Sequence, residues 1–302
     1  MRNPVGITNI GDPFVLVHDG KYYMYATSFI DGFYVWESSD LEHWSEPHVA
    51  YKMGEKSFGY ADFWAPEVVY HEGRFLMHYS SRRKEDNSLR IGVAVAGSPL
   101  GPFVDVYDKA PMFDFGYAAI DGHVFIDDDG QAYLYYSRDC SENIIGDRHE
   151  SHLYVVRLDS SLTKVCGEPI WLMKPEQPWE YDPAYKWSWN EGPYMIKRDD
   201  VYYLMYSGNC YATKYYSTGY ATANSPMGPF TKAPENPILS FVEGCVSGPG
   251  HNCLFTSLDG QLMCAYHVHT DYNHPSQDRQ MFIDRAYFEN GKLLVEGPTF
   301  AE

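Results

Sequence analysis

The chain has 302 residues, of which 41 are acidic and 23 are basic, giving a formal net charge of −18 at pH 7. This charge repels a phosphate backbone, and no face rich in lysine and arginine is apparent that could neutralise one, so nucleic acid is excluded as the expected partner. No apolar stretch approaches the roughly 18 residues that span a bilayer, which excludes a membrane-spanning helix.

The composition is typical of a turn-rich β protein. Aromatic residues make up 17%, and the 25 glycines and 19 prolines are scattered between short apolar runs instead of forming a linker. The first residues lack the apolar core of a secretory signal, so we expect a cytoplasmic location. The six cysteines include no CxxC pair, and we expect free thiols.

The first predicted element is a hairpin, "DPFVLVHDGKYYMYAT" (residues 12–27), which turns at Asp19-Gly20. Its second half recurs along the chain as "GRFLMHYSS" from Gly73, "GQAYLYYSR" from Gly130, "DVYYLMYSG" from Asp200 and "GQLMCAYHV" from Gly260. The starts lie 53, 57, 70 and 60 residues apart, which suits a four-stranded unit with variable loops. All four recurrences carry tyrosine at the sixth position after the turn, where the first repeat has Ala26.

A third strand follows several of these hairpins. The segments "GFYVWESSDLEHW", "IGVAVAGSPLGPF" and "GYATANSPMGPF" resemble one another, and long stretches of helical periodicity are missing. Five such units predict an all-β fold, a five-bladed β-propeller with four-stranded antiparallel blades around a central axis, in one domain spanning residues 1–302. A β-sandwich of ten or more strands is the alternative, but it does not explain why there are five repeats.

The strand before each turn is expected to be the innermost strand of its blade, so its first residues should face the axis. Counting back nine residues from the four later turns, and eight from Gly20, gives five positions that we expect to be equivalent: Asp12, Trp64, Asp121, Glu191 and His251. Aspartate at such a strand start often only caps a turn. The shared register instead predicts that these side chains meet at one channel mouth.

Three carboxyl groups in one aromatic pocket repel each other and lose water, so at least one should keep its proton near neutral pH. A protonated and an ionised carboxyl group side by side are what the hydrolysis of an acetal bond requires, because one protonates the departing oxygen and the other attacks or activates water. The pattern therefore predicts a glycoside-hydrolysing site.

Five motifs, in this order, resemble glycoside hydrolase family 43, whose members are five-bladed propellers: "GDPF", "FWAPEV", "IDGHVFIDDDG", "WNEGPYM" and "SGPGHNCLF". The likeness covers nearly the whole chain. It implies inverting hydrolysis, with Asp12 as the general base and Glu191 as the general acid. Asp121 is then the third carboxylate, which orients the acid and raises its pKa.

The same resemblance implies two further residues at the site. An axial histidine of the family matches His251 and in some members helps to hold a calcium ion or its waters near the propeller axis. An arginine of the final repeat contacts sugar hydroxyls and corresponds to Arg279. We expect no cofactor to be required, and no residue is assigned as a direct metal ligand.

Three aromatic residues are candidates for a platform under a sugar ring, namely Trp64, Phe33 and Trp189, although aromatic residues in propellers more often pack between blades. The twelve histidines occur without an HExxH or Cys/His set, so no catalytic zinc is expected. The acidic run 127–129 is expected to be a solvated turn and not a calcium loop. The polar segment 137–152 either shapes the pocket rim or contacts a neighbouring subunit.

The resemblance, together with these observations, implies an exo-acting glycosidase that releases arabinofuranosyl or xylosyl residues from oligosaccharides of plant polysaccharides. Within the resembled family, an endo-arabinanase, a galactofuranosidase and a galactosidase are alternatives. A carbohydrate-binding propeller without catalysis is an alternative of another class, although such a protein need not keep three acids in register. The expected partner is an oligosaccharide substrate, and the sequence leaves the oligomeric state open.

Overall fold

The computed structural model describes residues 3–300, and nearly all of its regular structure is β-strand. Twenty strands form five four-stranded antiparallel units in chain order, which we call blades 1 to 5. Blade 1 contains β1 (Thr8–His18), β2 (Lys21–Phe29), β3 (Gly32–Ser38) and β4 (His48–Lys52). Blade 2 contains β5 (Gly59–His71), β6 (Arg74–Arg83), β7 (Leu89–Ala96) and β8 (Val104–Asp105).

The three later blades repeat this meander. Blade 3 contains β9 (Ala119–Ile126), β10 (Ala132–Arg138), β13 (His152–Leu158) and β14 (Val165–Met173). Blade 4 contains β16 (Asn190–Arg198), β17 (Val201–Gly208), β18 (Ser217–Ala223) and β19 (Thr231–Lys232). Blade 5 contains β20 (Gly250–Thr256), β21 (Leu262–His269), β22 (Arg279–Glu289) and β23 (Lys292–Val295).

A few short elements lie outside the blades. A three-stranded sheet is formed by β11 (Ile144–Ile145), β12 (Arg148–Glu150) and β15 (Trp187–Ser188). One 3-10 turn, η1, spans Pro178–Glu180. In the described part of the chain, no helix has the length and apolar character needed to cross a membrane.

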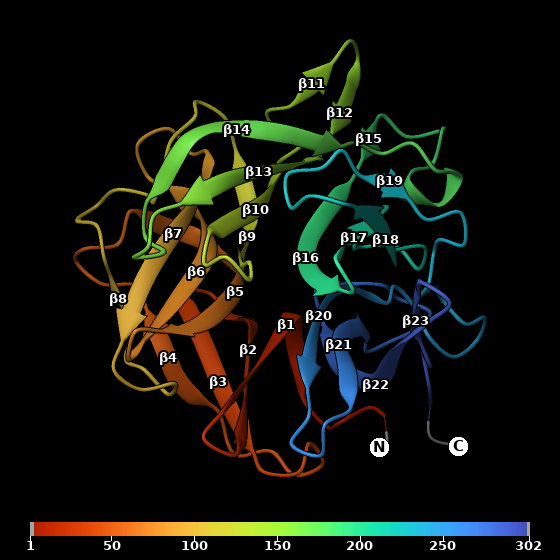
Figure 1. The fold of residues 1–302 in the computed structure, drawn as a ribbon, viewed down its shortest axis with the longest axis horizontal. Coiled ribbons are helices and arrows are strands. Elements are labelled where there is room, and N and C mark those ends of the chain that lie inside the picture. Colours follow the sequence, from red (N-terminus) through yellow and green to blue (C-terminus); the bar gives the residue numbers. More distant parts are fainter. Residues whose placement is uncertain (1–2, 301–302) are drawn as a thin grey trace.

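The blades stand around a common centre, with the first strand of each blade innermost (Figure 1). The all-β propeller predicted from the repeats is therefore confirmed. The first and last blades are joined by a short pairing between β1 and β22, in which Ile10 lies opposite Arg279. This closure brings Arg279 beside the strand that carries Asp12, although 267 residues of chain separate the two.

The repeated tyrosine explains why the sequence repeat is visible. Tyr79, Tyr136, Tyr206 and Tyr266 are fully buried between the blades. Their hydroxyl groups are not left unpaired, because they bond to Asp105, Tyr117, Glu180 and Asp284, respectively. A buried aromatic ring needs such a partner for its polar tip, so the recurring tyrosine marks the core and not the site.

Each innermost strand contains a β-bulge near its start. One residue of each bulge has a left-handed backbone, with φ between 47° and 59°: Asp12, Ala65, Asp121, Gly192 and His251. These are the equivalent positions of the five blades. The predicted register is thus correct in blades 1, 3 and 5, but it is wrong by one residue in blades 2 and 4, where it selected Trp64 and Glu191.

Turn length explains this error. The hairpins of blades 2 and 4 close with two residues, as between His71 and Arg74, whereas those of blades 3 and 5 are longer, as between Ile126 and Ala132. Counting back nine residues from the turn therefore reaches the bulge residue in blades 3 and 5, but it reaches the residue before the bulge in blades 2 and 4. Glu191 stands immediately before the bulge residue of its blade.

A side chain from each blade holds the bulge of the next one. At four junctions it accepts the backbone N–H of the bulge residue: Thr27 Oγ1 from Ala65 (2.9 Å), Ser80 Oγ from Asp121 (2.9 Å), Ser207 Oγ from His251 (2.7 Å) and His267 Nδ1 from Asp12 (3.1 Å). The junction between blades 3 and 4 differs in the strand that supplies the acceptor, which is the first strand of its blade and not the second. There the N–H of Gly192 donates to the carboxylate of Asp121 instead, at 3.0 Å.

Candidate active site

A cavity of ≈ 270 Å³ lies where the innermost strands begin. It is lined by all three predicted acids and by four of the five other predicted site residues: Asp12, Asp121, Glu191, Trp64, Trp189, His251 and Arg279. The acids come from blades 1, 3 and 4. The propeller thus brings together residues that are up to 267 positions apart in the chain.

Phe33 does not belong to this group. Its side chain has 0% exposure and packs against Tyr51, Phe63 and Tyr79 in the aromatic core between blades 1 and 2. A fully buried ring has no free face to offer to a sugar, so the predicted platform role of Phe33 is corrected to core packing.

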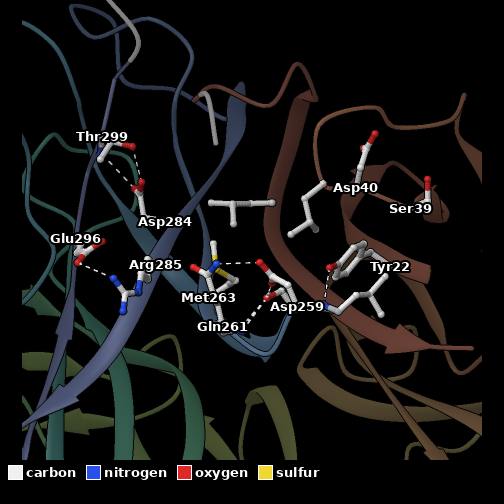
Figure 2. A pocket seen from close by; sticks show the side chains of 14 residues that line it. Tyr22, Ser39, Asp40, Asp259, Gln261, Met263, Asp284, Arg285, Glu296 and Thr299 are labelled. Carbon is white, nitrogen blue, oxygen red and sulfur yellow. Dashed lines mark hydrogen bonds and ion pairs between the residues drawn. The ribbon is translucent and has the colours of Figure 1, made fainter. Parts of the chain in front are cut away.

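A larger cavity, of ≈ 530 Å³, is formed by residues of blades 1 and 5 and of the C-terminal segment (Figure 2). Its charged groups bond to each other or to nearby polar groups. Arg285 faces Glu296 at 3.5 Å, and Gln261 Nε2 donates to Asp259 at 2.8 Å. None of the three predicted acids lines it, so the smaller cavity is the candidate active site.

Asp12 is surrounded by groups that favour its charged form. Arg279 Nη1 lies 3.0 Å and His251 Nδ1 3.3 Å from Oδ1, and the Thr27 hydroxyl donates to Oδ2 at 2.6 Å. Burial by itself would raise the pKa of Asp12, but the Arg279 guanidinium, the two neighbouring imidazoles and the Thr27 hydroxyl outweigh it and hold this pKa well below its usual range. Asp12 is therefore ionised at neutral pH.

The other two acids are shifted in the opposite direction. Burial raises the pKa of Asp121 to about 6, with a further contribution from the charge of Asp12. Burial, followed by the charge of Asp121, raises the pKa of Glu191 well above its usual range, although the Tyr216 hydroxyl donates to Glu191 Oε1 at 2.9 Å. Two neighbouring buried carboxyl groups resist simultaneous ionisation, so Glu191 holds its proton to a higher pH than an ordinary glutamate does.

Asp121 is also linked to Glu191 through the backbone. Its Oδ2 accepts the N–H of Gly192, the peptide that directly follows Glu191. Its own N–H is held by Ser80 of the preceding blade. Asp121 therefore both raises the pKa of Glu191 and fixes the backbone next to Glu191.

Gly192 is required at this point for two reasons, and replacing it with alanine provides a test. Its φ is +56°, and a Cβ atom would lie 3.1 Å from His251 Nδ1. We expect Gly192→Ala to lower the free energy of unfolding by about 1–2 kcal/mol through the backbone conformation alone, and to displace His251 from Asp12. Urea unfolding and the rate of glycoside hydrolysis check this.

The matched control is Gly20→Ala, because Gly20 has a φ of +71° and open space around its Cβ position. This variant should lose comparable stability but keep its hydrolytic rate. Equal catalytic rates for the two variants would show that a side chain at position 192 does not disturb the site.

The side chains around His251 do not form a calcium site by themselves. Calcium usually takes six to eight oxygen ligands, whereas the His251 ring contacts a single carboxylate, that of Asp12. Among residues 3–300, no group of three or more His, Cys, Asp and Glu side chains is arranged to hold a metal ion.

Comparison with known proteins decides the family. The family model "Glycosyl hydrolases family 43" matches residues 1–293. The chain belongs to glycosyl hydrolase family 43. It is therefore a glycoside hydrolase, and its substrates are oligosaccharides.

Similar proteins match most or all of the chain. A thermostable family-43 glycoside hydrolase of known structure is 49% identical, with a TM-score of 0.95, and the alignment covers 100% of this chain and 97% of that one. A β-D-galactofuranosidase of Aspergillus niger is 30% identical over 99% of this chain and 88% of its own. A xylosidase/arabinosidase of Bacteroides ovatus is 27% identical over 74% of this chain and 76% of its own.

Several residues of this family 43 site escaped sequence analysis. Tyr216, which donates to Glu191, lies in a loop without a recognisable motif. Asp139 lines the cavity, and its charge contributes to the raised pKa of both Asp121 and Glu191. His267 could have been found, because it stands where the other four repeats have Thr or Ser.

A buried ion pair anchors the start of the strand that carries Glu191. Lys232 Nζ contacts both carboxylate oxygens of Glu180, at 2.6 and 2.7 Å, and donates to Asn190 Oδ1 at 3.0 Å. Glu180 has 0% exposure. Because Lys232→Met leaves this carboxylate buried without its cation, we expect a loss of about 3–5 kcal/mol in the free energy of unfolding, measured with urea.

Lys292→Met is the control for this substitution. The Lys292 ammonium is half exposed and lies 3.9 Å from Glu235, so its removal should change stability by less than about 0.5 kcal/mol. A similarly small effect for Lys232→Met would contradict the anchoring role of the buried pair.

Proposed function

We propose that this family 43 enzyme is an inverting, exo-acting glycosidase in which Glu191 is the general acid and Asp12 the general base. One observation carries this proposal: two carboxyl groups that line one cavity have pKa values shifted in opposite directions, downwards for Asp12 and upwards for Glu191. Such a split assigns acid and base roles to chemically similar groups at one pH.

In the proposed reaction, neutral Glu191 donates its proton to the glycosidic oxygen as the bond to the anomeric carbon breaks. Ionised Asp12 takes a proton from a water molecule whose oxygen bonds to that carbon from the opposite side. The products are the free sugar with inverted anomeric configuration and the released alcohol. Asp121 orients Glu191 through Gly192 and keeps its pKa high.

The proposed substrate is an oligosaccharide with a terminal arabinofuranosyl or xylosyl residue. The cavity of ≈ 270 Å³ lies just below the range of about 300–1,000 Å³ typical of ligand pockets, which suits a terminal unit better than a long chain. Trp64 and Trp189 supply aromatic surface for a sugar face. The xylosidase/arabinosidase of Bacteroides ovatus supports this choice.

A terminal galactofuranosyl residue is the second candidate. It is supported by the β-D-galactofuranosidase of Aspergillus niger, which matches 99% of this chain. Aryl glycosides of arabinofuranose, xylose and galactofuranose distinguish the candidates, because the enzyme should strongly prefer one glycosyl unit. Proton NMR of the first-formed sugar should show the inverted anomer. A retained anomer would require one carboxylate to act as a nucleophile and would overturn the proposed roles.

A carbohydrate-binding propeller without catalysis fits this site less well, because binding alone does not need a neutral and an ionised carboxyl group together. This alternative would be favoured if the protein bound these sugars tightly but hydrolysed none of the glycosides.

A further inference from the structure

The inserted segment between β10 and β13 is built onto the strand that leads to Glu191. Strand β12 pairs in parallel with β15, so that His149 lies opposite Trp187 and Glu150 opposite Ser188. The N–H of Asn190, directly before Glu191, donates to Ser151 O at 3.1 Å. The insertion is therefore fixed to the cavity rim by backbone hydrogen bonds, close to the general acid. Figure 1 shows β11 and β12 projecting beyond blade 3.

Three aromatic rings are stacked on this rim. The His149 ring lies 3.9 Å from the Trp187 ring at an interplanar angle of 13°, and Trp187 lies 6.4 Å from Trp189 at 22°. Both tryptophans line the cavity. His149 is itself held, because its Nδ1 lies 3.0 Å from Cys140 O. Trp187 nevertheless remains 41% exposed, so this indole is held by its neighbours without being enclosed in the core.

The position of this stack relative to Glu191 indicates what it would contact. A general acid protonates the oxygen that stays with the leaving group, so the leaving sugar must lie on the Glu191 side of the scissile bond. Trp187 and Trp189 precede Glu191 by four and two residues on the same segment. Arg279 and His251, by contrast, surround Asp12, on the side where water attacks the anomeric carbon of the glycosyl unit.

We propose that Trp187, supported by His149, is the platform for the leaving sugar. This inference rests on the proposed function and specifies its substrate class: a glycosyl unit linked to a second sugar whose ring presents a flat apolar face, such as a pyranose. Aromatic rings bind such faces by stacking, and a ring already fixed in place loses little conformational freedom when it does so. His149 acts through Trp187 and is a positioning residue.

The test compares two substrates with the same glycosyl unit and anomeric configuration: a disaccharide with a pyranose leaving group, and the corresponding glycosyl fluoride. Fluoride is too small to reach the platform. For Trp187→Ala, the ratio of kcat/KM on the disaccharide to kcat/KM on the fluoride should fall about tenfold, mainly through KM. His149→Ala should lower the same ratio by a smaller factor, and His149→Phe should restore it, because phenylalanine can still stack on Trp187.

Trp171→Ala is the matched control, since Trp171 is similarly exposed but lies on the outer strand β14, away from the cavity. Its ratio should equal that of the wild type. An unchanged ratio for Trp187→Ala would overturn the platform. If the sedimentation mass of this variant changed while the ratio did not, the rim would instead be assigned to contact between subunits. If the wild-type enzyme cleaved neither substrate for any glycosyl unit tested, the proposed function itself would fail.

Discussion

Replacing Glu191 with alanine should lower kcat by about 10²–10⁴-fold on a disaccharide but far less on an aryl glycoside with a strongly acidic phenol as leaving group. A sugar alkoxide cannot depart without a proton, whereas an acidic phenolate can. Asp12→Ala should lower kcat on both substrates, because water must be activated whichever group leaves. Steady-state kinetics of both variants on both substrates measure this contrast.

The exposed Glu289 at the end of β22 provides the control, and Glu289→Ala should behave as the wild type on both substrates. Equal losses on the two substrates for Glu191→Ala would show that Glu191 does not deliver the proton. Activity within tenfold of the wild type for Asp12→Ala would remove the base assignment.

The second large effect is expected in the pH dependence of kcat/KM. The reaction needs Glu191 protonated, so the rate should fall as the pH rises through the raised pKa of Glu191. The negative charge of Asp121 contributes to that raised pKa, after burial. Asp121→Asn removes the charge, lowers the pKa of Glu191, and should therefore move the basic limb of the profile to lower pH.

This substitution separates two roles of Asp121. An asparagine side chain can still accept the N–H of Gly192 through its oxygen, so the orientation of Glu191 is kept while the charge is lost. Asp121→Ala loses both and should reduce kcat further at every pH. A basic limb that stays in place or moves to higher pH in Asp121→Asn would contradict the electrostatic role.

Much of the fold could be predicted because its signals are local. A hairpin turn followed by a buried tyrosine recurs in four repeats, and each such pair lies within a few residues of sequence. The register of the innermost strands could not be fixed in this way, because the hairpin turns differ in length. Glu191 was still selected, since its side chain reaches the same cavity from the residue before the bulge.

The residues that were missed or misplaced depend on contacts between blades. Phe33 is a candidate platform from its aromatic side chain alone, and only the packing of blade 1 against blade 2 shows that its ring is enclosed. Tyr216 reaches Glu191 from a loop 25 residues away. His267 was visible as the exception among five repeats, but its role follows only from the closure of blade 5 on Asp12.

The most direct test of the whole account is the protonation state of Glu191 itself. In enzyme labelled with ¹³C at the glutamate side-chain carboxyl, the Glu191 resonance can be assigned by its loss in Glu191→Gln. We predict that this resonance keeps the shift of a protonated carboxyl group at pH 7 and titrates only above it. Titration near pH 4.3, where an ordinary glutamate ionises, would contradict the division of acid and base between Glu191 and Asp12.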